Sequence, residues 1–416
     1  MAGDSADTET LVADAAGTPL VRLLAVDGVR IPRIEAGNRL TLSRFAWVRP
    51  LGDELIAETS LGGAAVILED PRAAALLFGF GREQPVLDAA AAAGLAIGEA
   101  LEVAAVLHAA SVLVDPDQRR AEDEPPLAVW EFHDLLFHVR SRRGRHPNLV
   151  GGTYRFIERI PPAAAVPLAR WTESVELERP DHERLQHEDP PLARVQAARR
   201  SIRDYGHRPI TLAELSEFLY RVGSVEDLLV QRLPPRAAAD SIEFAVRPYP
   251  SGGALYELEL YPAVRSCEGL APGLYHYAAD RHRLELVSVG SKPLDQLTAG
   301  AAAATASEHE SMQVLIVITA RMGRIAWKYE SLAYALVLKH VGVVLQTMYL
   351  AATAMGLAPC AIGTGESDLF AQASGIDYYE ESAVGEFMLG SRPSPGPLTG
   401  RSAGTSEQSV SGQEPF

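Results

Sequence analysis

The sequence predicts an α+β protein with two domains. Its 416 residues are more than one ordinary hydrophobic core organises, so two domains joined by linkers are expected. Runs of β-branched residues such as Gln313–Thr319 indicate buried strands. Helical patterns with their own capping residues also occur, and Thr211 with Glu214 forms one such capping box. No internal repeat of fixed period accompanies these patterns, so a repeat architecture is not expected.

The amino-terminal region is predicted to be a small unit of short strands followed by short helices. Residues 1–18 are small, polar and acidic, and we expect them to be disordered. A β-ribbon followed by short helices is the outline of a winged-helix module over residues 19–118, and an ordinary α+β packing domain is the equal alternative. The expected strands are Phe45–Val48, Glu54–Glu58 and Ala64–Leu68, and the expected helices are Arg72–Phe78 (with Asp70 as N-cap), Val86–Ala93 and Gly98–Ala109.

Residues 119–191 are predicted to connect the two domains. Large apolar residues alternate with histidine and arginine over Trp130–Arg143, so this stretch is expected to be ordered against a core. Glu173–Pro191 is acidic and is expected to be an exposed linker.

Residues 192–393 are predicted to form the larger domain, and the Ser-, Gly- and Pro-rich residues 394–416 a flexible tail. A long apolar helix is expected after Tyr329, ending at Gly356 as the glycine just past its last turn. The expected strands are Glu257–Val264, Gly273–Tyr277, Leu284–Val287, Gln313–Thr319 and Val384–Gly390, and a capped helix follows Thr211.

Composition excludes several classes of protein. The net charge of −16 argues against binding to a phosphate backbone, so nucleic acid is not an expected partner. Two cysteines exclude a disulfide framework and fit a reducing cytoplasm. The apolar stretches Val86–Leu113 and Leu332–Leu357 are interrupted by charged and polar residues, so neither is expected to span a membrane.

Two segments carry residues suited to a phosphorylated, ring-containing ligand. Arg199, Arg200 and Arg203 place three guanidiniums within five residues, with the hydroxyl of Ser201 between them. Arginine matches phosphate oxygens with a planar fork, although a solvated basic helix face is the ordinary explanation. Pro250-Ser251-Gly252-Gly253 lets backbone approach a flat ligand closely, although by itself it is simply a turn.

Two further segments add a proton-handling pair and a small-residue loop. Lys328 next to Tyr329 favours the phenolate electrostatically and so poises it for proton transfer. Gly363-Thr364-Gly365 follows a short predicted strand, but Asp368 stands where the third glycine of a dinucleotide fingerprint would be. Histidines lack paired ligand spacing, so no metal site is predicted.

In this order, these four motifs resemble those of the SagB-type peptide dehydrogenases, a branch of the flavin-dependent nitroreductase superfamily. The resemblance covers about residues 194–392, with Trp130–Tyr154 similar to the segment that precedes the family's domain. It implies a nitroreductase-like FMN domain: a homodimer, a central sheet rich in antiparallel pairs and a long buried dimer helix. Arg199, Arg200, Ser201 and Arg203 would contact the FMN phosphate and ribityl chain, with Arg392 as a weaker candidate. Pro250–Gly253 would lie against the isoalloxazine, and Gly363, Thr364 and Gly365 would help close the site.

The resemblance also implies an activity. Such enzymes oxidise thiazoline or oxazoline rings in ribosomally made peptides to thiazoles or oxazoles, with Lys328 and Tyr329 handling the proton. Our hypothesis is that Tyr329 is the base and Lys328 stabilises its anion, with the roles open to exchange. An NAD(P)H-dependent nitro- or quinone reductase, a different peptide desaturation on the same fold, and a scaffolding subunit without activity are the alternatives. The amino-terminal unit would bind a leader peptide as an extra strand, pack on the dimer, or dock a cyclodehydratase partner.

Overall fold

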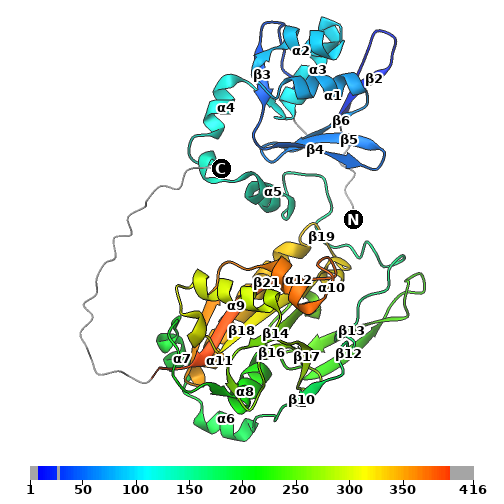
Figure 1. Cartoon of the computed structure of the whole chain (residues 1–416). Coiled ribbons are helices and arrows are strands. Elements are labelled where there is room, and N and C mark those ends of the chain that lie inside the picture. The colour runs from blue at the N-terminus through cyan, green and yellow to red at the C-terminus, as the bar shows by residue number, and fades with distance from the viewer. Residues whose placement is uncertain (1–7, 26–28, 394–416) are drawn as a thin grey trace. The chain divides into compact units, whose positions relative to one another are not determined.

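The computed structural model describes residues 8–25 and 29–393, which form two compact units (Figure 1). The first unit comprises residues 1–155 together with Lys328–Ala335, and the second comprises Phe156–Trp327 together with residues 336–416. The predicted connecting segment, residues 119–191, is therefore divided between the units at Arg155. The predicted tail at 394–416 lies outside the described residues.

An antiparallel sheet forms half of the first unit. Its strand order is β1-β2-β6-β5-β4. The disorder predicted for residues 1–18 is wrong for Thr8–Ala13, which form β1, because Val12 is buried opposite Val21 of β2. The turn after β1 is closed by the Asp14 carboxylate, which accepts the N–H groups of Ala16 and Thr18. Residues 1–7 lie outside the described part. The strands are β1 (Thr8–Ala13), β2 (Pro19–Ala25), β4 (Ala46–Leu51), β5 (Glu54–Thr59) and β6 (Ala64–Leu68).

Short helices form the other half of the first unit. Asp70 caps α1 by accepting the N–H of Arg72, as the sequence predicts. The axes of α2 and α3 bend by 113° across a turn at Gly94, which is the geometry of a helix-turn-helix. The helices are α1 (Pro71–Gly79), α2 (Val86–Ala93), α3 (Ile97–Ala109), α4 (Pro116–Glu122), a 3₁₀ turn at Leu127–Val129 and α5 (Phe132–Arg140), and a small sheet joins β3 (Arg39–Leu42) to β7 (Gln84–Pro85) and β8 (Leu113–Val114).

A seven-stranded antiparallel sheet is the centre of the second unit. Its order is β10-β17-β16-β14-β18-β21-β20, so β20 is an edge strand. This confirms the predicted α+β fold with an antiparallel sheet. The strands are β10 (Ser174–Glu176), β14 (Leu258–Val264), β16 (Gly273–Ala278), β17 (Arg283–Ser288), β18 (Val314–Arg321), β20 (Leu357–Ile362) and β21 (Glu381–Ser391).

Helices cover both faces of this sheet. Met388 of β21 belongs to one core with α9 and α12, whereas its neighbour Phe387 contacts Phe218 of α8 and Tyr349 of α11 on the opposite face. Thr211 and Glu214 form the predicted capping box of α8. The helices are α6 (His182–Glu188), α7 (Leu192–Ala198), α8 (Leu212–Gly223), α9 (Lys292–Ala304), α10 (Met322–Ala326), α11 (Ala333–Ala354) and α12 (Ser367–Ser374), with 3₁₀ turns at Gly252–Ala254 and His309–Ser311.

Two parts of the second unit differ from the prediction. The exposed linker predicted at Glu173–Pro191 is wrong, because Val175 of β10 pairs with Leu284 at the sheet edge and α6 follows, capped by Asp181. A hairpin of β12 (Asp227–Arg232) and β13 (Ser241–Val246) was not predicted. The remaining short strands pair β11 (Ile210–Thr211) with β15 (Cys267–Glu268).

Helix α11 is only partly buried in the single chain. Its buried residues recur every three or four positions, at Val337, Val341, Val344, Met348 and Ala352, and so form one stripe. Leu338 is 42% exposed, and Leu336, Val343, Leu345 and Leu350 are half-buried. The expected burial of this helix between two subunits stays a prediction. By length and composition, α11 is long and apolar enough to cross a membrane, but the core helices of globular proteins meet the same criterion.

Candidate functional site

The arginine segment lies along the outer edge of the central sheet. Helix α7 ends before Arg199, and the chain then runs extended beside β20, where the Ile202 N–H donates to the Pro359 carbonyl at 2.8 Å. Ser201 Oγ lies 2.6 Å from the hydroxyl of Tyr349 on α11, and the Arg199 guanidinium lies 5.2 Å from the centroid of the Tyr349 ring. The segment is thus fixed to β20 and α11.

The guanidiniums of this segment carry positive charge that the described chain does not neutralise. Among the described residues, no carboxylate comes within 4.0 Å of Arg199, Arg200 or Arg203, and Arg200 Nε donates only to the Ala198 carbonyl. About half of the other arginines in the described residues are ion-paired, for example Arg184 and Arg208. Three unneutralised guanidiniums beside a serine hydroxyl fit the phosphate of a flavin mononucleotide.

The small-residue loop opens directly from β20. Gly363, Thr364 and Gly365 are exposed, and a Cβ built on Gly363 would meet nothing within 4 Å. The Tyr349 hydroxyl accepts the Ala361 N–H at 2.8 Å, two residues before the loop. Tyr349 therefore ties the arginine segment to the strand that carries the loop. Sequence reasoning missed it, because nothing in a long apolar helix distinguishes a tyrosine that bonds to two distant segments.

We expect Tyr349→Phe to loosen this junction. The change leaves Ser201 Oγ and the Ala361 N–H without their common partner, which costs about 1–3 kcal/mol of unfolding free energy. Urea unfolding checks the stability. Tyr379→Phe, at an 85% exposed tyrosine, is the control and should be neutral. Equal stability of the two variants would contradict the structural role of Tyr349.

The Pro250–Gly253 turn is held by a buried histidine. The Gly252 N–H donates to His340 Nε2 at 2.8 Å, so Nε2 is unprotonated and Nδ1–H faces the Glu257 carboxylate at 2.6 Å. The next residue, Ala254, has a φ of 54°, an uncommon conformation for a residue with a side chain. His340 and Glu257 were also missed by sequence reasoning, which treated His340 only as a polar interruption.

Helix α11 thus positions two of the predicted segments. His340 holds the turn and Tyr349 holds the arginine segment, nine residues apart on the same helix. That separation corresponds to about 13.5 Å along the helix axis. An elongated ligand with a phosphate at one end and a ring at the other matches such a spacing.

A buried carboxyl lies beneath the small-residue loop. Glu386 of β21 is 2% exposed, and its Oε1 accepts the Glu366 N–H at 3.4 Å and would lie 3.4 Å from a Cβ on Gly365. Burial, together with the nearby Glu366 carboxylate, raises the pKa of Glu386 from 4.5 to about 7. The Glu386 carboxyl therefore gains or loses its proton near neutral pH.

We expect Glu386 to make stability fall as pH rises from about 4.5 to about 7. In that window the folded chain keeps a proton that the unfolded chain has released, so each step up in pH favours unfolding, by roughly 3 kcal/mol in total. Calorimetry between pH 5 and 8 checks this. Glu386→Gln should flatten the decline and raise the melting temperature at pH 8, and unchanged pH dependence in the variant would contradict the assignment.

Arg392 lies in a separate setting. It lines a cavity of about 650 Å³ with residues 205–208 and residues 355–357, which follow α11, and none of the other predicted flavin residues lines that cavity. Its position directly after β21 is as the sequence predicts. Its proposed contact with phosphate stays a prediction.

Lys328 and Tyr329 belong to the first unit. Tyr329 and Glu330 form β19, which pairs with β9 (Gly151–Gly152), and the Tyr154 N–H donates to the Lys328 carbonyl. The Lys328 ammonium lies 5.4 Å from the ring centroid of Tyr329 and 5.5 Å from that of Tyr154. Tyr154 and Ser331, on either side of the pair, have φ of 54° and 62°, and such strained residues cluster at functional sites.

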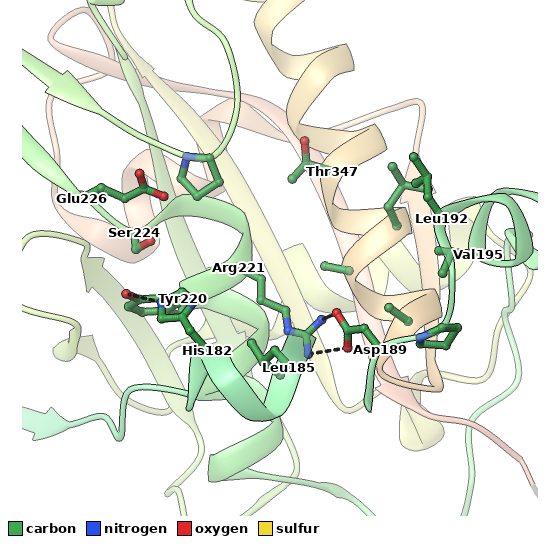
Figure 2. A pocket seen from close by; sticks show the side chains of 15 residues that line it. His182, Leu185, Asp189, Leu192, Val195, Tyr220, Arg221, Ser224, Glu226 and Thr347 are labelled. Carbon is green, nitrogen blue, oxygen red and sulfur yellow. Dashed lines mark hydrogen bonds and ion pairs between the residues drawn. The ribbon is translucent and has the colours of Figure 1, made fainter. Parts of the chain in front are cut away.

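A cavity of about 600 Å³ lies between α6, α8 and α11 of the second unit (Figure 2). Arg221 reaches across it to Asp189, with two hydrogen bonds of 2.8 and 3.0 Å. Thr347 and Leu350 of α11 form its other side. None of the residues predicted to bind flavin or to act on substrate lines this cavity. Within the described part of the chain, no group of three or more potential metal ligands occurs.

Two family models match separate parts of the chain. Residues 40–147 match the model described as cyanobactin oxidase ThcOx, and residues 197–391 match the nitroreductase family. A putative nitroreductase of Methanocaldococcus jannaschii is 30% identical over 194 residues, which are 46% of this chain and 85% of that protein. The trifolitoxin-processing protein TfxB of Rhizobium leguminosarum bv. trifolii is 26% identical over 34% of this chain and 38% of its own length.

Several solved structures match the chain over part of its length. A putative nitroreductase from Ralstonia eutropha has a TM-score of 0.40 at 19% identity, over 56% of this chain and 95% of that one. A chain of the Escherichia coli microcin synthetase McbBCD complex has a TM-score of 0.39 at 20% identity, over 62% of this chain and 91% of that one. A putative nitroreductase from Exiguobacterium sibiricum in complex with FMN has a TM-score of 0.34 at 15% identity, over 51% of this chain and 93% of that one.

Proposed function

Because this chain belongs to the nitroreductase family, we propose that it is an FMN-dependent oxidase that converts thiazoline or oxazoline rings of a ribosomally made peptide into thiazoles or oxazoles. The observation that carries the proposal is the set of unneutralised guanidiniums, Arg199, Arg200 and Arg203, joined through Tyr349 to the Gly363–Gly365 loop. The match of residues 40–147 to a cyanobactin oxidase and the similarity to a trifolitoxin-processing protein support a peptide as substrate.

Each of the predicted segments has a role in this reaction. The arginines and Ser201 hold the phosphate, and the turn at Gly252 and the Gly363–Gly365 loop offer backbone to the ring system. FMN, when bound, supplies a two-electron acceptor for hydride. Conversion of an azoline to an azole removes one proton and one hydride from adjacent ring carbons, so a base is also required. Tyr329 takes the proton and Lys328 stabilises the resulting anion, or the two roles are exchanged.

We further propose that the enzyme is a homodimer in the cytoplasm. A second copy packed on α11 would cover Leu338 and the half-buried leucines and valines around it, an apolar surface that a single chain leaves in water. Cys267 and Cys360 are both free, as in a reducing compartment. A cyclodehydratase that makes the azoline is the expected partner of the dimer.

The visible spectrum of the purified chain, with mass identification of any released ligand, tests the flavin assignment. A yellow protein that releases FMN is expected. A colourless protein that FMN does not reconstitute would overturn the proposal and favour a scaffolding subunit.

An NAD(P)H-dependent nitro- or quinone reductase is the second candidate, favoured by the 30% identity to a putative nitroreductase. Such an enzyme bleaches its flavin rapidly with NADH or NADPH. The proposed oxidase is instead reduced by an azoline peptide and reoxidised by dioxygen, so stopped-flow reduction with each donor separates the two. A peptide that loses two hydrogens outside an azoline ring would indicate a different desaturation.

A further inference from the structure

A second pocket lies wholly within the first unit, on α5 and the segment after it. Its volume is about 290 Å³, and it is lined by Leu61, Leu127, Trp130, Leu135, His138, Val139, Arg142, Arg143 and Arg145. The apolar residues Leu61, Leu127, Trp130, Leu135 and Val139 form what we call its floor, and Arg142, Arg143 and Arg145 form what we call its rim. None of the residues used in the proposed reaction belongs to it.

The floor of the pocket is preformed. Leu135 and Val139 of α5 pack with Phe45 in one small core, against which Trp130 and Leu127 also lie. Arg44 donates to the carbonyl oxygens of Glu122, Leu127 and Trp130, at 2.7 to 3.2 Å, and so fixes the wall that carries the tryptophan. The pocket has room for a large apolar side chain without rearrangement.

The rim carries positive charge without counter-charge. Arg143 donates to the Val150 carbonyl at 3.3 Å and Arg145 to the Ser60 carbonyl at 3.4 Å, both neutral acceptors. No carboxylate among the described residues lies within 4.0 Å of the Arg142, Arg143 or Arg145 guanidinium. By contrast, Arg140 on α5 pairs with Glu58 at 2.7 Å. An acidic chain thus leaves three exposed cations around one apolar hole.

This arrangement selects an anionic group beside an apolar one. A small anion would leave the apolar floor unfilled. A nucleic acid, with a negative charge on every phosphate, would meet more repulsion from a chain with a net charge of −16 than a short acidic peptide would. A peptide segment in which aspartate or glutamate neighbours a large apolar residue satisfies both the rim and the floor.

The rim is also joined to the proposed catalytic pair within the same unit. The segment that follows Arg145 is fixed to residues 330 and 331: Ser331 Oγ donates to the Leu149 carbonyl, and Thr153 Oγ1 donates to the Glu330 carboxylate at 2.8 Å. Gly151 and Gly152 pair with Glu330 and Tyr329. A peptide bound at the rim is therefore bound by the segment that pairs with Tyr329 and Glu330.

We propose that this pocket binds an acidic, apolar segment of the peptide substrate, remote from the ring that is oxidised. The proposal rests on the proposed function for the identity of the substrate. Such binding energy, gained away from the reacting atoms, holds the ring at the site and raises kcat/KM.

The test is fluorescence anisotropy with the full chain and a fluorescein-labelled peptide of about ten residues in which leucine and phenylalanine alternate with glutamate. A matched probe carries glutamine in place of every glutamate. The wild-type chain should bind the glutamate probe at least tenfold more tightly. Arg142→Gln, Arg143→Gln and Arg145→Gln together should remove that difference. All three side chains are exposed, so the fold should persist.

A matched control removes the same charge elsewhere on the first unit. Arg30→Gln, Arg33→Gln and Arg82→Gln together also replace exposed arginines, and should weaken binding less than twofold. Equal weakening by both triple variants, or none by either, would overturn the proposal. Tighter binding of a labelled oligothymidine than of the glutamate probe would indicate a nucleic-acid site instead. Flavin content is read separately, so a yellow chain that ignores the peptide refutes this inference alone, and a colourless chain that binds it refutes the proposed function alone.

Discussion

Replacing Lys328 by alanine together with Tyr329 by phenylalanine is expected to lower azoline oxidation by about 10²–10⁴-fold while leaving bound FMN unchanged. General acid–base catalysis typically accelerates a reaction by about 10²–10⁴-fold, and the double variant is expected to lose that acceleration. Flavin binding should survive because both residues belong to the first unit, whereas the arginine segment and the Gly363–Gly365 loop belong to the second. The measurement is loss of two hydrogen masses per ring in a thiazoline peptide, followed by mass spectrometry.

Tyr334→Phe is the matched control. Tyr334 also lies in the first unit, is 45% exposed and contacts Phe137 edge to face at 5.8 Å between centroids. Its hydroxyl has no part in the proposed reaction, so oxidation should proceed at the wild-type rate. A double variant of Lys328 and Tyr329 that oxidises the peptide as fast as this control would remove the pair from the mechanism.

Single variants separate the two roles. If Tyr329 is the base, Tyr329→Phe should lose most of the rate at every pH. Lys328→Ala should keep a slower reaction, because the tyrosine remains as the base but its anion lacks the neighbouring cation. The opposite pattern would assign the proton to Lys328. The placement of the Lys328 ammonium over two aromatic rings gives the lysine a fixed position from which either role is feasible.

Much of the fold could be predicted from local signals. The strand Ala64–Leu68, the helix Val86–Ala93 and the Thr211 capping box agree with the structure because their determinants lie within a few residues. The strands β1 and β10 were missed because their partners, not their own composition, make them strands: Val12 is buried opposite Val21, and Val175 pairs with Leu284 from more than 100 residues away. From its own sequence an acidic segment is predicted to be exposed to solvent, because the strand with which it pairs is not evident there.

The candidate site could also be predicted only in part. Residue types, read together with the family resemblance, pointed to the arginines, the Pro250–Gly253 turn and the glycine loop. The residues that hold these segments, Tyr349, His340 and Glu386, could not be found from the sequence. Each acts across a long separation, as His340 does on Gly252, 88 positions away. Positioning by α11 is a property of the folded chain, and local pattern carries no signal for it.

Arg199→Ala combined with Arg203→Ala is expected to weaken FMN binding by at least about 10²-fold. Hydrogen bonds to a charged group contribute about 1.5–3 kcal/mol each, and two are removed. Riboflavin has the same ring system without the phosphate, so its affinity should change less than threefold. The ratio of FMN to riboflavin affinity, measured by quenching of flavin fluorescence, should therefore fall toward one in the variant. Added salt should weaken FMN binding to the wild-type chain more than riboflavin binding.

The control for this variant is Arg236→Ala. Arg236 is an exposed arginine of the same unit that pairs with Glu158, and its loss should leave both affinities unchanged. If the double variant kept the wild-type preference for FMN, the phosphate would lie elsewhere. The remaining candidate would then be Arg392 in the cavity beside residues 205–208, and Arg392→Ala would be expected to show the loss instead. Since these arginines belong to different surroundings, the two variants separate the two positions for the phosphate, and the ratio of FMN to riboflavin affinity decides between them.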